Sequence, residues 1–311
     1  MRIVKNLTDL DAAFKGGAVA IGNFDGVHLG HRAVIHEAGN LARDHGIPWC
    51  VLTFEPHPRA LFRPDDPPFR LTSPEAKARL IGDLGVDCLI ELTFDEAFSS
   101  LTAEEFVDQV LVEGLGAAQV VAGYDFVFGK GRKGDCDLLL HRGREKGFGF
   151  LAVSAHGDGE VFSSTRVRNH LRDGDARAAA TVLGQPFEIE GEVLRGDQRG
   201  RQIGFPTANL GLGDYLRPKN GVYAVRAKVS DEPDGTWMAG VANLGRRPTY
   251  PTEDVMIEVH LFDVAPDLYE RRLRVALMDF IRAEQKFDGL DALKAQIAAD
   301  ADRARALLES F

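Results

Sequence analysis

The feature that most constrains the fold is a change of hydrophobic pattern near Gly184. Before it, apolar strand-like runs alternate with segments of helical period, which is typical of a parallel sheet covered by helices. After it, apolar runs alternate with turns, a pattern typical of a small antiparallel β-barrel. A chain of 311 residues suits two cores, because single domains usually hold about 100 to 200 residues. We predict a Rossmann-like α/β domain over residues 1–184 and a β-barrel with a terminal helix over residues 185–311.

The first half contains apolar runs that predict five strands of one largely parallel sheet. The runs are AVAIGNF, PWCVLTF, VDCLIEL, QVVAGYDF and FGFLAVSA. Helical periods separate them, from about His31 to His45, after Ser73, and in DLLLHRGREKG. Thr102 and Glu105 have the spacing of a capping box, which predicts a further helix start.

The second half predicts five strands and one helix. The strand-like runs are FEIEGEVLRG, GVYAVRAKVS, TWMAGVANLG, VMIEVHLFD and RLRVALMDFI. The final helix is predicted to begin at Asp288. Its apolar residues recur every three or four positions and form one stripe for packing on the barrel, namely Leu290, Leu293, Ile297, Ala301, Ala304 and Leu308.

Charge and composition exclude several classes of protein. A net charge of −10 and a pI near 5.4 oppose binding to a nucleic-acid backbone. No run approaches the roughly 18 apolar residues of a membrane span, and polar residues interrupt the N-terminal stretch that a secretory signal needs. The three cysteines form no C-x-x-C pair and predict reduced thiols. We expect a cytoplasmic monomer or weak homo-oligomer with no nucleic-acid or membrane partner.

The segment GNFDGVHLGHRAVI joins the first predicted strand to the first helix. Ligands of open α/β sheets bind at the carboxyl ends of strands, so this turn is a candidate site. Gly22, Gly26 and Gly30 allow close backbone approach to an anionic ligand. The spacing matches neither G-x-G-x-x-G nor the P-loop pattern. His28 and His31 place two imidazoles at a helix N-terminus, where their N–H groups can stabilise charge on a phosphoryl group during transfer.

Two other interpretations of His28 and His31 stay open from spacing alone. The first is structural, with one histidine capping the helix and the other in a loop. The second is a zinc pair, for which the sequence offers no third ligand at a suitable spacing.

Several motifs in a fixed order carry a family resemblance. They are GNFDGVHLGH, TFEPHP (residues 53–58), GYDFVFGKGRKGD (123–135), SSTRVR (163–168) and PTAN (206–209). Over nearly its whole length, the chain resembles the bifunctional riboflavin kinase/FAD synthetases. The resemblance implies that residues 1–184 adenylylate FMN to FAD and that residues 185–311 phosphorylate riboflavin to FMN. It also implies ATP as co-substrate, Mg²⁺ as cofactor, and riboflavin, FMN and FAD as flavin ligands.

The resemblance makes His28 and His31 catalytic and adds a second nucleotide-binding segment. In SSTRVR, a serine can begin a helix whose first turns carry Arg166 and Arg168. Cations at that position oppose the helix dipole unless a polyphosphate binds; solvated arginines on an exposed turn are the alternative. The predicted nucleotide-binding set of this half is Gly22, Asn23, Phe24, Gly26, Gly30, Ser164, Thr165, Arg166 and Arg168.

The resemblance places the flavin of the adenylyl-transfer site near His57, Phe62, Asp125 and Phe128. From spacing alone, the PHP turn around His57 is only a rigid loop. The alternating aromatic residues of YDFVF equally suit core packing of a strand. Family members commonly have Arg where this chain has Val127, and often Asn where it has Asp125, so the role of this loop stays open.

In the second half, PTAN follows a glycine- and arginine-rich loop and is the riboflavin-kinase signature of the family. Thr207 and Asn209 offer neutral oxygens that suit Mg²⁺ held chiefly by ATP phosphates and water. Gly196, Gly200 and Gly204 would let the loop cover these phosphates, with a plain barrel hairpin as the alternative.

The strand VMIEVHLFD places a carboxylate opposite its apolar face. Alternation puts Ile257 and Val259 on one face and Glu258 and His260 on the other. Spacing alone favours an edge-strand surface charge, whereas the resemblance makes Glu258 the catalytic base. The ribityl hydroxyl of riboflavin needs a proton acceptor when it attacks phosphorus, while the phosphate oxygen of FMN is already mostly ionised. A base is therefore expected in the second site and not in the first.

Two other functions fit part of the sequence. A nucleotidyltransferase acting on another small phosphate or carboxylate could use the β-domain as an accessory, but PTAN and Glu258 argue against it. A flavin-sensing binding protein would keep both pockets without turnover, and the full complement of predicted catalytic residues argues against that. Incubation with riboflavin and Mg-ATP, followed by chromatography, separates these functions.

Overall fold

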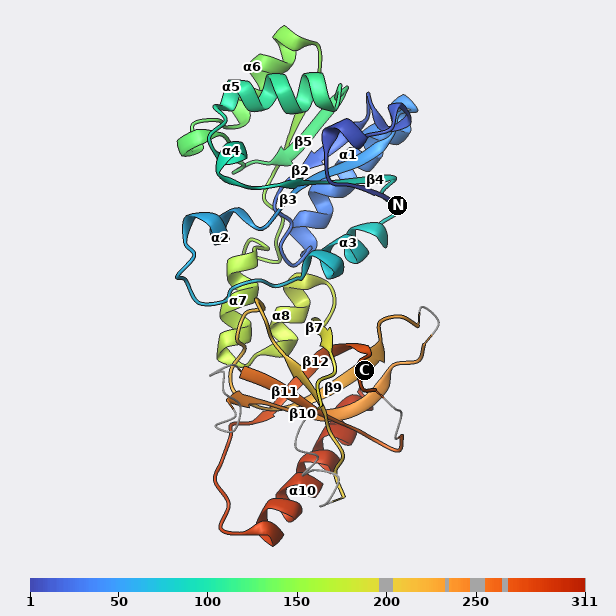
Figure 1. Ribbon diagram of the computed structural model, residues 1–311, viewed down its shortest axis with the longest axis vertical. Helices are drawn as coiled ribbons and strands as arrows, with labels where there is room; N and C mark the ends of the chain where they lie inside the picture. The colour runs from blue at the N-terminus through green and yellow to red at the C-terminus, as the bar shows by residue number, and fades with distance from the viewer. Residues whose placement is uncertain (196–203, 233–234, 247–254, 265–267, 311) are drawn as a thin grey trace. The chain divides into compact units, whose positions relative to one another are not determined.

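The chain divides into two compact units (Figure 1). The first contains Met1–Asp66 and Pro74–Ser163, and the second contains Pro67–Ser73 and Ser164–Phe311. Residues 67–73 therefore pack with the second unit, although the chain returns to the first unit after them. The computed structural model describes residues 1–195, 204–232, 235–246, 255–264 and 268–310.

The first unit contains a six-stranded parallel sheet with the order β1-β4-β3-β2-β5-β6. Its strands are β1 (Arg2–Val4), β2 (Ala18–Ile21), β3 (Trp49–Glu55), β4 (Cys88–Thr93), β5 (Gln119–Gly123) and β6 (Gly149–Val153). The predicted parallel α/β fold is confirmed, but the prediction of five strands is wrong by one. β1 is a three-residue edge strand with Arg2 and Ile3 exposed, so it lacks a recognisable apolar run.

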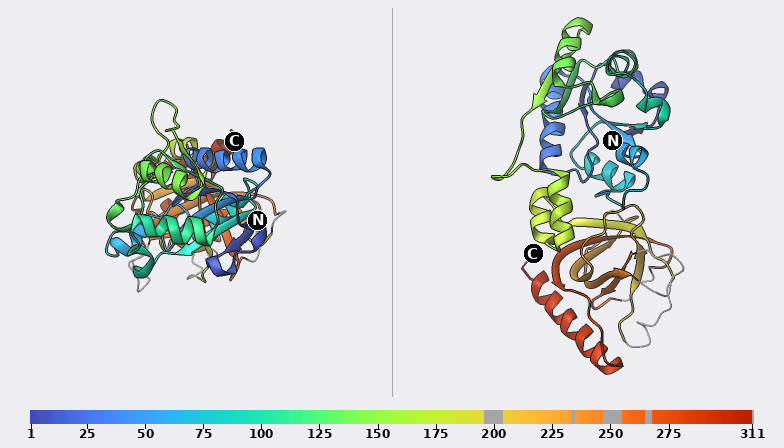
Figure 2. Two further views of the ribbon diagram at one scale, coloured as in Figure 1. Left: turned by 90° about the horizontal axis from the view of Figure 1, so that it is seen from above. Right: turned by 90° about the vertical axis from the view of Figure 1, so that its left-hand side faces the viewer.

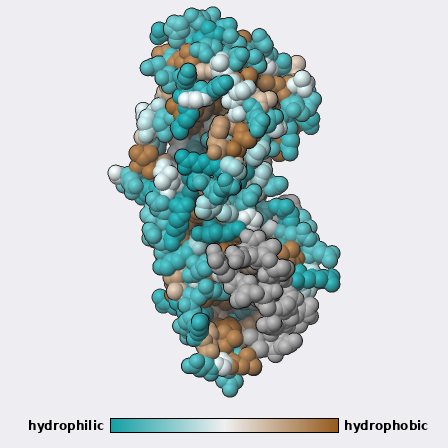
Figure 3. Space-filling view, turned by 60° about the vertical axis from the view of Figure 1, so that its left-hand side comes forward, coloured by the Kyte–Doolittle hydropathy of each residue, from teal (hydrophilic) through white to brown (hydrophobic). Residues whose placement is uncertain are grey.

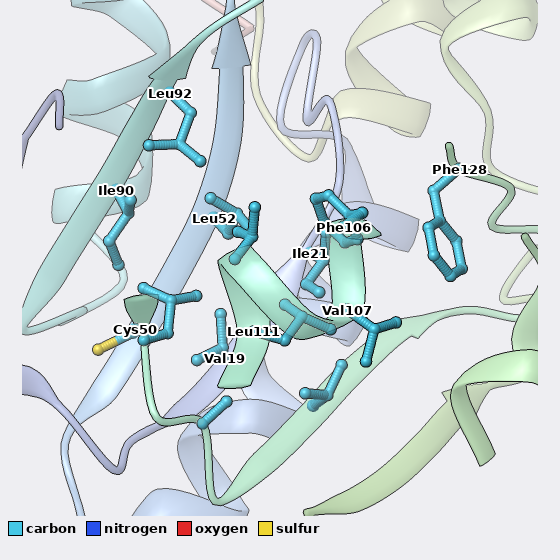
Figure 4. Close-up of a cluster of buried hydrophobic side chains, with 14 of the residues drawn as sticks. Val19, Ile21, Cys50, Leu52, Ile90, Leu92, Phe106, Val107, Leu111 and Phe128 are labelled. Atoms are coloured by element: carbon cyan, nitrogen blue, oxygen red, sulfur yellow. The ribbon is translucent and has the colours of Figure 1, made fainter. Parts of the chain in front are cut away.

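Helices cover both faces of this sheet. They are α1 (Leu29–His45), α2 (Pro58–Phe62), α3 (Pro74–Gly82), α4 (Glu96–Ser99), α5 (Ala103–Glu105), the π-helix η3 (Phe106–Gly114) and α6 (Cys136–Lys146), with short 3₁₀ turns η1 (Leu7–Asp9), η2 (Ala12–Phe14) and η4 (Lys130–Arg132). Successive strand residues point to opposite faces and feed two cores. Ala20 and Val51 pack with residues of α1 and α3. Val19 and Leu52 pack with Phe106 and other η3 residues on the opposite face (Figure 4).

Local signals set the helix ends. The Glu105 amide donates to Thr102 Oγ1 (3.1 Å), and the Thr102 amide donates to the Glu105 carboxylate (2.8 Å), so the predicted capping box is confirmed. α1 begins at Leu29, slightly before the predicted start near His31, because His28 is its N-cap.

β2 lies inside the sheet, with β3 on one side and β5 on the other. The chain goes from β2 to β3 in one direction and later returns to β5 on the other side. The carboxyl ends of strands at such a reversal form the usual ligand crevice of open α/β sheets. The turns after β2 and after β5, which carry GNFDGVHLGH and GYDFVFG, both start at this edge.

The second unit is built on a six-stranded antiparallel sheet with the order β7-β12-β9-β10-β11-β8. Its strands are β7 (Phe187–Glu192), β8 (Ala208–Gly211), β9 (Gly221–Val229), β10 (Met238–Arg246), β11 (Val255–Leu261) and β12 (Arg272–Arg282). The Leu194 amide donates to the Asn209 carbonyl (2.8 Å), which links the chain after β7 to β8 and nearly closes the barrel. The predicted barrel is confirmed, with β8 as an additional strand. Its four residues, ANLG, are too few and too polar to stand out in the sequence.

The described residues of the second unit include the helices α7 (Ser164–Asp173), α8 (Ala176–Leu183) and α10 (Leu290–Leu308). The stretch before Gly184 forms two helices, because Gly174 has a φ of 84° and Asp175 caps α8. Arg177 of α8 forms an ion pair with Asp279 of β12 (2.8 Å), so α8 is fastened to the barrel.

The terminal helix α10 lies along one side of the barrel (Figure 2). Its N-cap is Gly289, without a side-chain hydrogen bond, so the prediction that Asp288 begins it is wrong by a residue or two. Ala301, Ala304 and Leu308 pack on barrel residues, as the predicted stripe requires. Leu290, the first residue of that stripe, is 52% exposed.

The described surface is mainly polar where it can be seen. On the face in Figure 3, hydrophilic residues predominate and apolar residues form small separate patches. None of the described helices has both the length and the apolar character needed to cross a membrane.

Candidate active sites

The turn after β2 contains two non-glycine residues in left-handed backbone conformations. Phe24 has a φ of 50° and Val27 a φ of 40°, with Gly26 between them at 87°. Such a conformation is especially unfavourable for a β-branched residue, and strain of this kind concentrates at functional sites. Phe24 and Val27 are 1% and 0% exposed, so tight packing holds the turn in this shape.

His28 and His31 form a stacked pair at the N-terminus of α1. Their ring centroids are 3.5 Å apart and their planes differ by 22°. The His31 amide donates to Nδ1 of His28 (3.2 Å), so the structural interpretation of His28 as a cap is confirmed. The other half of that interpretation is wrong, because His31 lies in the first turn of α1 and not in a loop. Because Nδ1 of His28 accepts this bond, Nε2 is the ring nitrogen that carries the proton in this arrangement. The cap therefore orients His28 as a hydrogen-bond donor through Nε2.

Two glycines leave little room for a larger residue in this geometry. A Cβ atom at Gly22 would lie 2.9 Å from the Phe24 ring, and one at Gly30 would lie 3.2 Å from the His28 ring and 3.0 Å from a backbone carbonyl. Phe24 in turn packs edge-on against His31, with centroids 5.4 Å apart. The structure thus brings together, in one turn, the predicted residues Gly22, Asn23, Phe24, Gly26, His28, Gly30 and His31.

Two of the predicted flavin residues of this unit, Phe62 and Phe128, contact other aromatic rings. His57 caps α2, and its Nδ1 accepts a hydrogen bond from the Arg59 amide (3.1 Å). The Phe62 ring is 65% exposed and lies 5.9 Å from that of Phe94. Phe128 is buried in the hydrophobic core. Phe94 is partly buried, and an exposed aromatic ring beside a partly buried one can support a planar ligand.

The segment YDFVF is a turn and not a strand. β5 ends at Gly123, and the Phe126 amide donates back to the Gly123 carbonyl (3.0 Å). The expectation of a strand is therefore wrong, but core packing is confirmed for Phe128, which lies in the core, and for Phe126, which packs against that core and stacks on Phe128 at 5.6 Å. Tyr124 and Asp125 are exposed, and a flavin contact of Asp125 stays a prediction.

α7 begins at Ser164, as SSTRVR predicts, and carries Thr165, Arg166 and Arg168 in its first turns. Nε of Arg168 donates to the Phe69 carbonyl (2.9 Å), and its guanidinium lies 5.7 Å from the Phe69 ring centroid. This segment belongs to the second compact unit, whereas the histidine pair belongs to the first. Their participation in one nucleotide site stays a prediction.

Three polar residues lie side by side across β10, β11 and β8. Glu258 pairs in the strand register with Asn243 on one side and with Asn209 on the other. Directly paired residues project from the same face of a sheet, here the face opposite the buried Ile257 and Val259. β11 is an interior strand, so the interpretation of Glu258 as an edge-strand charge is wrong. The strand pattern did not single out Asn243.

Asn209 has an unsatisfied buried oxygen. It is 6% exposed, its Nδ2 donates to the Thr207 carbonyl (3.5 Å), and its Oδ1 has no hydrogen-bond partner in the described part of the chain. Such an orphaned acceptor is costly unless a ligand satisfies it. Among the described residues, no three or more His, Cys, Asp or Glu side chains gather to hold a metal. The neutral oxygens of Asn209 and Thr207 fit a Mg²⁺ ion whose other ligands are mainly phosphates and water.

His260 is a further residue of this site that the sequence pattern did not assign. Its Nδ1 lies 2.9 Å from the Pro206 carbonyl oxygen. A carbonyl only accepts, so Nδ1 carries the proton. The ring also packs edge-on against Phe205, with centroids 5.4 Å apart. His260 thus holds the segment before Thr207 in place. The strand alternation that puts His260 on the same face as Glu258 was the sequence signal that could have identified it.

The glycine-rich loop before this segment is described only at its end. Gly204 has a φ of 90°, a conformation that favours glycine. Gly196 and Gly200 lie outside the described residues, so coverage of phosphates by the loop stays a prediction.

The two units hold chemically different sites. The first offers imidazole and backbone donors at a helix N-terminus, which can stabilise phosphoryl charge without a protein nucleophile. The second sets a carboxylate beside neutral oxygens, which suits proton removal from a hydroxyl near metal-bound phosphates. Together they define a two-site, nucleotide-dependent transferase.

Comparison with known families agrees with that class. Residues 11–166 match the FAD synthetase family model, and residues 183–308 match that of riboflavin kinase. The bifunctional riboflavin kinase/FMN adenylyltransferase of Escherichia coli K12 is 44% identical over 308 residues, which are 98% of this chain and 97% of that protein. The Bacillus subtilis protein with the same description is 39% identical, over 92% of this chain and 90% of its own. The chain belongs to the bifunctional riboflavin kinase/FMN adenylyltransferase family.

A solved structure extends the similarity in fold. The crystal structure of a macrolide-efflux protein from Streptococcus pneumoniae matches with a TM-score of 0.84 and 32% identity. The match covers 97% of this chain and 98% of that one. The shared fold therefore includes both units.

Proposed function

We propose that this chain makes FMN and then FAD. The second unit transfers the γ-phosphoryl group of ATP to riboflavin, which yields FMN and ADP. The first unit transfers AMP from a second ATP to FMN, which yields FAD and pyrophosphate. The family models and the two different sites support this division of labour.

For the kinase reaction, Glu258 accepts the proton of the ribityl hydroxyl as its oxygen attacks the γ-phosphorus. Thr207 and Asn209 would hold Mg²⁺ together with the ATP phosphates, and the ion would neutralise phosphate charge. The observation that carries this proposal is the strand register that sets Asn209, with its orphaned buried oxygen, directly opposite Glu258.

For adenylyl transfer, the attacking oxygen of FMN needs no base, because the second pKa of a phosphate monoester is about 6. His28 and His31, with the amides at the start of α1, stabilise the charge that develops at the α-phosphoryl group. The remaining nucleotide contacts are proposed for Ser164, Thr165, Arg166 and Arg168, and the flavin contacts for His57, Phe62, Asp125 and Phe128.

The functional boundary is proposed at Gly184, with adenylyl transfer before it and the kinase after it. The ligands are small molecules only, namely ATP, riboflavin, FMN and FAD. Cytoplasmic action fits the free state of Cys50, Cys88 and Cys136. The chain is proposed to act as a monomer or a weak homo-oligomer.

The test is a time course with purified protein, riboflavin and Mg-ATP, read by chromatography. We expect FMN to appear first and FAD to follow, with both products absent in EDTA and restored by added Mg²⁺. A second reaction starts from FMN and reports the adenylyl transfer alone. FAD from FMN without any kinase product would support a lone nucleotidyltransferase, and binding without turnover would support a flavin-sensing protein.

A further inference from the structure

Lys77 is a fully buried cation on α3 that no sequence motif reveals. Its exposure is 0%, and its Nζ lies 2.7 Å from Oε1 of Glu55, the last residue of β3. A buried lysine is rare unless it is paired, because removing an ammonium group from water is costly. The ion pair with Glu55 therefore allows Lys77 to be buried, but it does not account for the other contacts of Nζ.

Nζ of Lys77 also approaches three uncharged oxygens. They are Thr53 Oγ1 (3.1 Å), the Asn23 carbonyl (3.4 Å) and the Phe54 carbonyl (3.5 Å). The Thr53 hydroxyl donates to the same Asn23 carbonyl (3.2 Å). An ammonium has three protons to donate, so one side chain can serve several acceptors at once.

These contacts join two segments of the adenylyl-transfer site. Asn23 lies in the turn after β2, past the last strand residue, so side chains and not a neighbouring strand satisfy its carbonyl. The next residue is Phe24, whose ring packs edge-on against His31 at 5.4 Å. Glu55 lies two residues before His57, which is proposed to line the flavin side. Lys77 thus fastens the histidine turn to the end of β3.

We infer that Lys77 is a positioning residue for adenylyl transfer, which holds the Asn23 carbonyl and through it the turn that carries the two histidines. This inference rests on the proposed adenylyltransferase function of the first unit. Lys77 touches neither substrate nor reacting atoms; it acts by fixing where the imidazole donors stand. A displacement of about 1 Å can cost a reaction around a hundredfold in rate.

A purely structural role for Lys77 predicts a different result. In that case Lys77 would only neutralise the partly buried Glu55 carboxylate, and removing both charges together would repair the site. In our proposal, the Asn23 carbonyl still lacks its ammonium donor after both charges are removed. The double substitution therefore separates the two roles.

The experiment compares Lys77→Met, Lys77→Arg and Lys77→Met with Glu55→Gln, and it measures both half-reactions on each protein. We expect Lys77→Met and the double variant to lower kcat for FMN-to-FAD conversion about a hundredfold, with KM for FMN changed by less than about threefold. Lys77→Arg should recover part of kcat, because it keeps a cationic donor. Riboflavin phosphorylation should stay at the parent rate in all three.

One further variant, with a matched control, keeps the inference testable if Lys77→Met fails to fold. Thr53→Val removes the hydroxyl between Nζ and Asn23 but keeps the Lys77–Glu55 ion pair, and it should lower kcat by about threefold to tenfold. The matched control is Lys146→Met, which breaks an exposed pair with Asp108 (2.8 Å) and should leave both activities unchanged.

The outcomes separate failure of this inference from failure of the proposed function. If the parent protein does not convert FMN to FAD, the proposed function itself is wrong. If the parent does so and the double variant has parental kcat, Lys77 only balances charge and the inference is overturned. A Thr53→Val variant with unchanged kcat and an unchanged KM also overturns it.

Discussion

The site of the first unit is built on loops, and the site of the second unit is built on strands. His28 and His31 depend on a strained turn held by packing at the edge of a parallel sheet. Glu258 and Asn209 depend on antiparallel register inside a barrel. The difference follows the chemistry: a helix N-terminus supplies donors for a phosphate that is already ionised, whereas a hydroxyl nucleophile needs a fixed carboxylate.

The two sites should therefore fail in different ways when they are damaged. The geometry of a site on loops depends on the packing and buried ion pairs that hold the loops in place, so substitutions away from the site should change its activity. A strand site depends on register, which many backbone hydrogen bonds hold in common. The predictions below run from the largest expected effect to the smallest, and each would break or sharpen this contrast.

Glu258→Gln should give the largest effect. It keeps size and hydrogen bonding but removes the proton acceptor, so riboflavin phosphorylation should fall by about 10² to 10⁴-fold. FMN supplied from outside should still be converted to FAD at the parental rate. An intact kinase rate would reject the base assignment, and loss of both activities would indicate misfolding.

His28→Ala or His31→Ala should produce the opposite pattern, with adenylyl transfer lost and riboflavin phosphorylation kept. Removing one preorganised donor costs about 10² to 10³-fold in rate, so FAD formation should nearly stop while FMN accumulates from riboflavin. Initial rates of both half-reactions on the same protein provide the measurement. FMN-to-FAD rates within about threefold of the parent would remove these residues from the site.

Two kinase fragments test whether the second unit is self-sufficient. Residues 183–311 and residues 164–311 should both phosphorylate riboflavin, because both keep all six barrel strands. The longer fragment keeps the pair between Arg177 and Asp279 and the buried Val182. Since burying one valine contributes about 1.5 to 3 kcal/mol, its Tm should be higher by about 4 °C or more.

Circular dichroism of the fragments serves as the control for folding. A short fragment that is folded yet inert would contradict the boundary at Gly184. Equal Tm values for the two fragments would contradict the prediction that α7 and α8 stabilise the barrel unit.

Glu91→Gln should give a small effect that depends on pH. Glu91 lies on β4 and is 7% exposed; burial raises its pKa above the ordinary value, and Lys77 opposes part of that rise. The folded state binds this proton more tightly than the unfolded state does. Glu91 therefore contributes its whole stabilisation below the unfolded-state pKa of about 4.3, and this stabilisation is lost as pH rises through the raised folded-state pKa. The substitution should therefore raise Tm by about 2 to 4 °C at pH 7.

Thermal unfolding from pH 4 to pH 8 provides the measurement for Glu91. The advantage of the glutamine variant should shrink toward pH 4, where the parent carboxyl is protonated in the folded state and mostly protonated in the unfolded state. The matched control is Glu104→Gln on the exposed part of α5, which should show no such trend. A constant difference across pH would contradict the prediction.

Sequence patterns predicted most of the fold because the long elements are locally periodic. The two missed strands, β1 and β8, are three and four residues long. Each exists because a neighbouring strand supplies its hydrogen bonds, as β11 does for β8. The predicted helix start near His31 was nearly correct, because the apolar period that predicts it is a local signal and α1 begins at Leu29. The role of Lys77, in contrast, depends on residues 22 to 54 positions away in the sequence.

By itself, the sequence determined the two fold classes, their order along the chain and the motifs of the two sites, because periodicity and contiguous motifs are local properties. Only the tertiary structure decided which distant side chains meet. It set Asn209 and Asn243 on either side of Glu258, joined Lys77 to the Asn23 carbonyl, and packed residues 67–73 with the second unit. The physical reason is that strand register and the pairing of buried polar groups are fixed when whole sheets and cores assemble, and no local period encodes them.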